Sequence, residues 1–238
     1  MISQSHDIYA AARNNAQWCD AMCRAHGTPG VFGERVWSSE RRTPPLYPDA
    51  VTLTQGATAG EVLGEIDRDA PGCSVKDSFG QLDLSADGFD VLFEARWLHR
   101  PAVLIAPVSP DDVTWRPVRT ARSLAAWATA WRDGDDSLAG LFRPELLADR
   151  ATTVLAGTAK DGRTVAGAVV TRSESVVGVS NLFGSDGDLD SAWAGCLATV
   201  AHLWPGMPVV GYEHGDSLAA ATRQGCVPGG VLRVWLAA

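Results

Sequence analysis

Basic residues are scarce in this sequence of 238 residues, where 20 lysines and arginines stand against 28 aspartates and glutamates and give a formal net charge of −8. Proteins that bind nucleic acid or anionic membranes nonspecifically present a basic face, because that face attracts phosphate groups. The composition therefore argues against both classes of partner. Only two of the twenty cations are lysines, and we interpret this arginine bias, with abundant alanine, as the mark of a GC-rich bacterial genome.

Long apolar runs are absent as well. None approaches the roughly 20 residues that a membrane-spanning helix needs, and the opening segment MISQSHDIYA lacks the basic and then apolar pattern of a secretion signal. We therefore expect a cytoplasmic protein. Five cysteines are an odd number for a reducing compartment, so no disulfide framework is expected. The hydrophobic fraction of 46% is enough for one large domain or two small ones, each with a core.

A complete set of metal ligands is also missing. Cys19, Cys23 and His26 have the i, i+4, i+7 spacing of one stripe on a helix expected from about residue 6 to 25. Two thiolates and an imidazole need a fourth ligand to complete a zinc site, and no second Cys-x-x-Cys or pair of histidines supplies it. Buried cysteine in a core is the favoured interpretation, and we expect no metal.

What is present is a clear order of elements in the C-terminal half. Two runs rich in β-branched residues, at 152–159 and 164–171, flank a Lys-Asp-Gly turn signal. A third strand is expected at Val176–Phe183, followed by a helix from Leu189 to about Leu203 that Asp188 or Asp190 caps. A strand at 208–213, a short helix at 217–224 and a closing strand at 231–236 complete the order.

This order resembles the acyl-CoA-binding half of the GCN5-related N-acetyltransferases. Residues 113–135 are expected to form a strand and then a helix with Leu124, Trp127, Ala128 and Trp131 on one face, and a second helix is expected at 141–151. These match the two helices that wall the acceptor site in that family, so the resemblance covers about residues 114–236. It implies an α/β fold with a mixed sheet, acetyl-CoA or another acyl-CoA as cofactor, and transfer of the acyl group to the amine of a small-molecule substrate. The fold alone does not fix the reaction, because function resides in sites.

In that family a glycine-rich loop between the third strand and the helix binds the pyrophosphate through backbone N–H groups. The corresponding segment, FGSDGDLDSAW, keeps two glycines but carries three aspartates and no basic residue. Three carboxylates beside a pyrophosphate repel it unless a metal or a remote arginine intervenes. The cofactor-binding residues that the resemblance implies are Asn181, Leu182, Phe183, Gly184, Gly187 and Arg223.

The family's later motif is met only in part by HGDSLAAATRQGC. Arg223 and Gly225 hold their places, but His214 replaces an asparagine, and Ala221 stands where many members have a tyrosine that acts as general acid. A relative that has lost the cofactor site and serves as a ligand-binding or scaffolding protein is therefore the alternative to an enzyme.

Glu213 and His214 are the catalytic candidates. They end the strand that, in the family, splays from its neighbour to admit the pantetheine arm of the cofactor. A carboxylate or an imidazole there can deprotonate an amine directly or through water, while a backbone N–H of the middle strand stabilises the oxyanion. The open alternative is that both side chains lie in solvent at a strand end.

The two halves, 1–108 and 109–238, share a weak internal similarity. Each has a Pro-Gly pair, a strand, a short helical piece that ends in glycine, and a closing strand that ends in Trp-Leu. We interpret the N-terminal half as a truncated copy of the same fold, although chance similarity remains open. A closing strand left exposed could pair across a two-fold axis and form a homodimer.

A long segment rich in proline, glycine and arginine, residues 28–50, follows the first helix and shows no periodicity. Long loops of this kind often bind ligands. Within it an aromatic residue beside arginines can hold a planar or anionic substrate by stacking and bidentate hydrogen bonds. The substrate-binding candidates are Trp37, Arg41, Arg42 and Tyr47.

A third class of function, a hydrolase or lyase, depends on the strand PGCSVKDSF. Cys73, Lys76 and Ser78 are its nucleophile and base candidates, but no Gly-x-Ser-x-Gly elbow occurs in the sequence. The favoured interpretation is an exposed edge strand with a weak Lys76–Asp77 surface pair.

Overall fold

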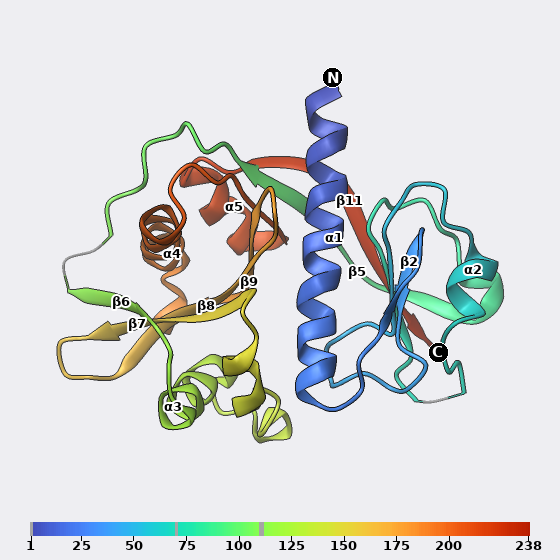
Figure 1. Ribbon diagram of the computed structural model, residues 1–238, viewed down its shortest axis with the longest axis horizontal. Coiled ribbons are helices and arrows are strands. Elements are labelled where there is room, and N and C mark those ends of the chain that lie inside the picture. Colours follow the sequence, from blue (N-terminus) through green and yellow to red (C-terminus); the bar gives the residue numbers. More distant parts are fainter. Residues whose placement is uncertain (1, 70, 110–111) are drawn as a thin grey trace. The chain divides into compact units, whose positions relative to one another are not determined.

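The protein is described by a computed structural model that covers residues 2–69, 71–109 and 112–238. The chain forms a mixed α/β fold and divides into two compact units. Unit 1 runs up to Trp97 and includes Gly229–Ala238, and unit 2 is Leu98–Pro228. Figure 1 shows the order of the elements, with unit 1 coloured from blue to green plus the red end of the chain, and unit 2 from green to orange-red.

The domain division into the halves 1–108 and 109–238 stays a prediction, and the two units do not coincide with those halves. The reason is the closing strand β11 (Val227–Ala237), whose last residues pair with a strand of unit 1. Strand pairing between residues so far apart in the sequence leaves no local signal. The prediction of a duplicated fold is a separate matter and stays a prediction.

Unit 1 begins with the long helix α1 (Ile2–Ala25) and contains a mixed sheet. Its first two strands are β1 (Val31–Phe32) and β2 (Val36–Ser38), and both fall within the segment expected to be a loop. That expectation was wrong because strands of two and three residues are too short to show an alternating pattern. The remaining elements are β3 (Ala50–Thr52), α2 (Ala59–Leu63), β4 (Ser74–Asp77), the 3₁₀ turn η1 (Ser85–Asp87) and β5 (Phe89–Arg100).

Strand β4 lies inside the sheet of unit 1. It pairs in parallel with β3 and antiparallel with β11, and all four of its residues are buried. The predicted exposed edge strand is therefore wrong, and β11 is not an edge either, since it lies between β4 and β5.

Unit 2 holds the predicted C-terminal order. An antiparallel meander of β6 (Val113–Pro117), β7 (Thr152–Ala159), β8 (Thr164–Arg172) and β9 (Val177–Gly184) continues into a parallel pairing of β9 with β10 (Val209–Glu213). The helices are α3 (Ala121–Arg132), α4 (Leu189–Leu203) and α5 (Gly215–Arg223). The second helix expected before the hairpin is only a 3₁₀ turn, η3 (Pro144–Ala148), opened by a proline.

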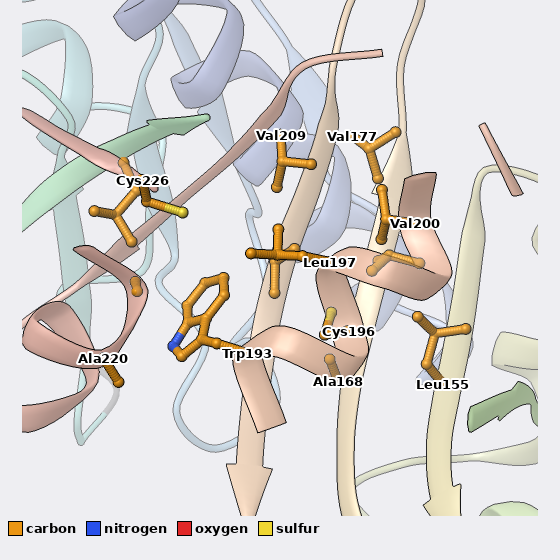
Figure 2. Close-up of a cluster of buried hydrophobic side chains, with 14 residues drawn as sticks. Leu155, Ala168, Val177, Trp193, Cys196, Leu197, Val200, Val209, Ala220 and Cys226 are labelled. Carbon is orange, nitrogen blue, oxygen red and sulfur yellow. The ribbon is translucent and has the colours of Figure 1, made fainter. Parts of the chain in front are cut away.

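The core of unit 2 lies between the sheet and helices α4 and α5. In Figure 2, Trp193 of α4 is packed beside Leu197 and points its indole nitrogen toward the α5 turn that carries Ala220. The core consists of strand residues from β7 to β10 together with one face of each helix. Its buried side chains include Leu155, Ala168, Val177, Trp193, Cys196, Leu197, Val200, Val209, Ala220 and Cys226.

The two units share a backbone pattern at the positions where their sequences are similar. In unit 1, Gly72 precedes β4 and Gly88 precedes β5, with φ of 76° and 84°. In unit 2, Gly206 precedes β10 and Gly225 precedes β11, with φ of 81° and 88°. A left-handed backbone favours glycine because that residue has no Cβ. The positive φ therefore explains the glycine of each Pro-Gly pair and the glycine at each helix end.

Candidate functional site

A β-bulge interrupts strand β9. Gly167 of β8 faces Phe183, but Val169 faces Ser180, so that Ala168 alone lies opposite both Asn181 and Leu182. Asn181 takes a left-handed backbone with φ of 53°, a conformation that asparagine tolerates better than most residues. A bulge leaves one residue outside the regular ladder, and it therefore changes the direction of the strand's backbone groups in the middle of the sheet.

The side chains on either side of the bulge go to opposite faces. Leu182 packs against the core formed with α4, whereas the Phe183 ring meets Trp127 edge to face at 5.4 Å between centroids. Trp127 in turn requires Gly167, because a Cβ there would lie 2.1 Å from the indole nitrogen. The predicted cofactor-binding role of Leu182 and Phe183 stays a prediction, and both also have packing roles.

Strand β10 is paired with β9 through only two residue pairs, Val209 with Val177 and Val210 with Gly178. Its last two residues are partly buried, whereas His214 begins α5 as an exposed N-cap residue. The two catalytic candidates therefore occupy different environments. A base in a protein interior is tuned by its surroundings much more than one in solvent, which makes Glu213 the stronger candidate.

The carboxyl of Glu213 titrates far from its ordinary range. Burial raises its pKa to about 7, against a smaller lowering by the hydrogen bond from the Ser217 hydroxyl. A general base works best when its pKa is close to the pH at which it operates. Ser217 was not predicted as a partner of Glu213, because that contact depends on how α5 leaves the end of β10.

The position of the family's tyrosine lies inside the core. Ala221 of α5 is fully buried and belongs to the same cluster as Ala220 and Cys226. A methyl group cannot donate a proton, so this position offers no general acid. Burial raises the pKa of the neighbouring Cys226 thiol to about 12, and the nearby Arg100 lowers it.

Residues of the glycine loop between β9 and α4 pack against one another. A Cβ on Gly184 would lie 2.3 Å from the carbonyl oxygen of Asp188, so the loop itself occupies the space that a side chain would take. The Asp188 carboxylate caps α4 by accepting a hydrogen bond from the backbone N–H of Ser191 at 3.0 Å. Gly187 has open space around it and a φ of 75°. Of the two predicted caps, Asp188 and Asp190, the structure has Asp188.

Arg223 is bound to a loop residue. Its Nε and Nη2 atoms donate to the two carboxylate oxygens of Asp190 at 2.7 and 2.6 Å. This bidentate geometry occupies the planar edge of the guanidinium that would otherwise face a phosphate. The interaction joins the end of α5 to the first turn of α4.

These observations test whether the loop fits the diphosphate of coenzyme A, and it does not fit. One N-terminal N–H group of α4 is taken by Asp188, the only arginine of the predicted set is paired with Asp190, and the loop contributes a further carboxylate at Asp186. An anion is stabilised at a helix N-terminus by free N–H groups and nearby cations, and here carboxylates of the protein itself fill that role.

A cavity of about 390 Å³ lies on the β6 side of this loop. Trp115, Gly184 and Ala192 form part of its wall, and Glu213 does not line it. The charged residues around it are Asp112, Arg163, Asp186 and Asp188.

The predicted substrate-binding residues of unit 1 all have partners within the protein. Trp37 is fully buried in β2 and donates its indole N–H to Asp20 at 3.2 Å, and Tyr47 packs edge to face on Trp18. Arg41 donates to the carbonyl of Gly27 at 2.7 Å, and Arg42 bonds to Asp49 and to the carbonyl of Gly72. Their role in substrate binding stays a prediction, while these contacts give each side chain a structural role.

The strand that carries the hydrolase candidates is buried. Lys76 donates to the Asn15 side chain at 2.8 Å, and the Ser78 hydroxyl has no hydrogen-bond partner in the described part of the chain. Burial raises the pKa of the Cys73 thiol to about 11, with Asp49 adding to the shift. A thiol with a raised pKa is a poor nucleophile because the thiolate is the reactive form.

The first-helix cysteines are buried, and all five cysteines are free. Burial raises the pKa of both Cys19 and Cys23. Within residues 2–69, 71–109 and 112–238, no group of three or more His, Cys, Asp or Glu side chains is placed to hold a metal ion. The helices in the same residues include none that combines the length and the apolar character needed to cross a bilayer.

Comparison with known proteins identifies the fold. No family model matches the sequence, and no curated protein matches it. Among solved structures, a GCN5-related N-acetyltransferase from Kribbella flavida is similar with a TM-score of 0.66 and 20% identity over 95% of each chain. A putative acetyltransferase of the GNAT family from Novosphingobium aromaticivorans gives 0.54 and 14% identity, covering 92% of this chain and 96% of that one.

A third structure, a GCN5-related N-acetyltransferase from Sphaerobacter thermophilus, gives a TM-score of 0.51 at 11% identity and covers 96% of this chain and 92% of that chain. The fold predicted from the sequence is thereby confirmed: the chain has the fold of the GCN5-related N-acetyltransferases. Because the matches extend over nearly the whole chain, both units have counterparts in these structures.

Proposed function

We propose that unit 2 catalyses transfer of an acyl group from an acyl thioester to the amine of a small molecule. The observation that carries this proposal is Glu213, a carboxyl with a pKa of about 7 at the end of β10, in a fold shared with GCN5-related N-acetyltransferases. Such a carboxyl is ionised to a useful fraction at neutral pH and still basic enough to accept a proton from an ammonium group.

The reaction follows from these groups. Glu213, directly or through a water molecule, takes a proton from the ammonium form of the substrate, and the neutral nitrogen then attacks the carbonyl carbon of the thioester. A C–N bond forms, the C–S bond breaks, and the second proton that the nitrogen loses goes to the leaving thiolate, while Glu213 returns the first proton to solvent. A backbone N–H of β9, the middle strand, is our candidate donor to the oxyanion.

Coenzyme A thioesters and a short thioester such as S-acetyl-N-acetylcysteamine are the donors to test. We expect the purified protein, incubated with each donor and a panel of primary amines, to release thiol and to form an amide that mass spectrometry detects. Glu213→Gln should lower kcat/KM by about 10²-fold or more, since general base catalysis contributes on that scale. Glu174→Gln is the matched control, because Glu174 is an exposed glutamate in the turn between β8 and β9.

A second candidate function is a ligand-binding relative without acyl transfer. Two observations favour it, namely the carboxylates in the glycine loop and the alanine at position 221. It predicts no amide product with any donor in the assay above, together with unchanged binding of the true ligand by the Glu213→Gln protein.

A further inference from the structure

The loop that joins β9 to α4 pairs its own carboxylates with groups that could otherwise bind an anion. Asp188 accepts the N–H of Ser191, and Asp190 occupies the Nε–Nη2 edge of Arg223. Residues 184–191 contain no lysine or arginine. A diphosphate that used the Ser191 N–H or this edge of Arg223 would have to displace a carboxylate of the protein.

The charges around the loop also disfavour a bound phosphate. Arg223 neutralises Asp190, and Arg163 is engaged by Asp161 at 2.7 Å, with Asp186 as a weaker electrostatic neighbour. The carboxylate of Asp188 then remains next to any incoming phosphate. Like charges at short range repel each other even near a protein surface, so the loop opposes a nucleotide diphosphate instead of attracting one.

The strands expected to receive the acyl arm, β9 and β10, are a different part of unit 2. Strands β9 and β10 are paired only at their first residues, and the bulge and Glu213 lie further along the same two strands. An uncharged thioester arm makes no demand on the carboxylates of the loop. The two parts of the donor would therefore be recognised at different places, the thioester arm at β9 and β10 and the nucleotide at the loop.

We infer that the acyl donor of this protein is recognised through its acyl-pantetheine portion, or an even shorter thioester, and that the nucleotide of coenzyme A contributes nothing to binding. This inference rests on the proposed acyl transfer. It names the donor class as acyl thioesters without a required nucleotide, and it separates this chain from proteins that use the α4 N-terminus as a phosphate site.

The test compares coenzyme A, pantetheine and adenosine 3′,5′-bisphosphate as ligands of the full chain, by saturation-transfer NMR and calorimetric titration. We expect coenzyme A and pantetheine to bind with dissociation constants within about threefold of each other, and the bisphosphate not to compete with pantetheine. Coenzyme A binding about tenfold or more tighter than pantetheine would overturn the inference, since one good charge-assisted phosphate contact has at least that effect.

The same experiment separates this inference from the proposed function. If only the nucleotide-containing ligands bind, the acyl-transfer proposal stands and the donor inference fails. If neither coenzyme A nor pantetheine binds at concentrations of roughly 10 mM, beyond the weakest affinities of functional interest, then both fail.

Two arginine substitutions supply the control. Arg223→Ala removes the guanidinium at α5, and Arg132→Ala removes one that is likewise paired with an aspartate, Asp136, at the end of α3. We expect the ratio of coenzyme A to pantetheine affinity to be the same in both variants and in the parent. A selective loss of coenzyme A affinity in Arg223→Ala alone would show that this arginine leaves Asp190 to bind phosphate, and the inference would be wrong.

Discussion

The indole N–H of Trp193 in α4 donates a hydrogen bond to the hydroxyl oxygen of Ser217 in α5, with 3.3 Å between nitrogen and oxygen. An indole can only donate, so this bond fixes Ser217 as an acceptor toward Trp193 and leaves its proton for the Glu213 carboxyl. The packing of two helices thereby orients the hydroxyl that lowers the pKa of Glu213.

Ser217→Ala is expected to raise the pKa of Glu213 above about 7, because it deletes the hydrogen bond that stabilises the ionised form. The shift should be about one unit, the effect of one such bond. NMR titration of the carboxyl carbon measures it directly, and the acidic limb of the kcat/KM profile should move to higher pH by the same amount. Ser217→Thr should restore the parent value.

Thr222→Ala is the matched control for that prediction. The Thr222 hydroxyl lies on the same helix and bonds to the carbonyl of Leu218 at 2.8 Å. Removing this hydroxyl should leave the pKa of Glu213 unchanged. A Glu213 pKa that is the same in Ser217→Ala as in the parent would contradict the role given to Ser217. The other titratable and charged neighbours, Cys226, Arg100 and His214, are unchanged in both variants.

Glu213 should also make stability fall as pH rises. Its folded pKa of about 7 lies above the ordinary glutamate pKa of 4.5, so between these pH values the folded state binds more protons than the unfolded state. The stability that this group contributes is present below about pH 4.5 and is lost as pH rises through 7. The loss is at most about 3 kcal/mol.

Urea unfolding of the parent and of Glu213→Gln between pH 5 and 8 measures this effect, since glutamine resembles the protonated carboxyl at every pH. We expect the variant to gain stability relative to the parent as pH rises, and to level off above about 7.5. A difference in unfolding free energy that is constant with pH would contradict the raised pKa.

Gly184→Ala should destabilise unit 2 much more than Gly187→Ala. A Cβ at Gly184 meets the backbone of Asp188 at 2.3 Å and must move the residue that caps α4, whereas Gly187 has open space and only a left-handed φ of 75°. We expect a cost of about 2 kcal/mol or more for Gly184→Ala and about 1 kcal/mol for Gly187→Ala. Urea titration followed by tryptophan fluorescence gives both values, and equal costs would be inconsistent with the packed loop.

The thiol of Cys73 should be unreactive in the folded protein. Burial raises its pKa to about 11, and the sulfur is shielded in the core of unit 1. A thiol reagent such as dithionitrobenzoate should label none of the five cysteines rapidly in the native protein and all five in guanidinium chloride. Rapid labelling of Cys73 in the native state would instead revive the hydrolase or lyase interpretation.

Much of unit 2 was predictable from local sequence. The hairpin was signalled by Asp161-Gly162 between β-branched runs, and α4 begins and ends at the predicted residues, Leu189 and Leu203. An N-cap aspartate and an apolar helical face are local signals that act over a few residues. The fold resemblance followed from the order of these elements.

Contacts between distant residues were not predictable. Arg223 was expected to bind a cofactor, but Asp190, thirty-three residues earlier, holds its guanidinium. Trp37 was placed in a loop, yet pairing of β2 with β3 and a hydrogen bond to Asp20 bury it. Such contacts leave no periodic pattern in the sequence.

The sequence by itself determined most strands and helices of unit 2, the resemblance in fold, and the surplus of acidic residues in the glycine loop, because each depends on neighbouring residues. Only the tertiary structure decided that β11 joins unit 1, that β4 is buried, and that Ser217 and burial bring the Glu213 carboxyl to a pKa of about 7. The physical reason is that pairing, burial and desolvation depend on which distant segments surround a residue, and the folded chain alone brings those segments together.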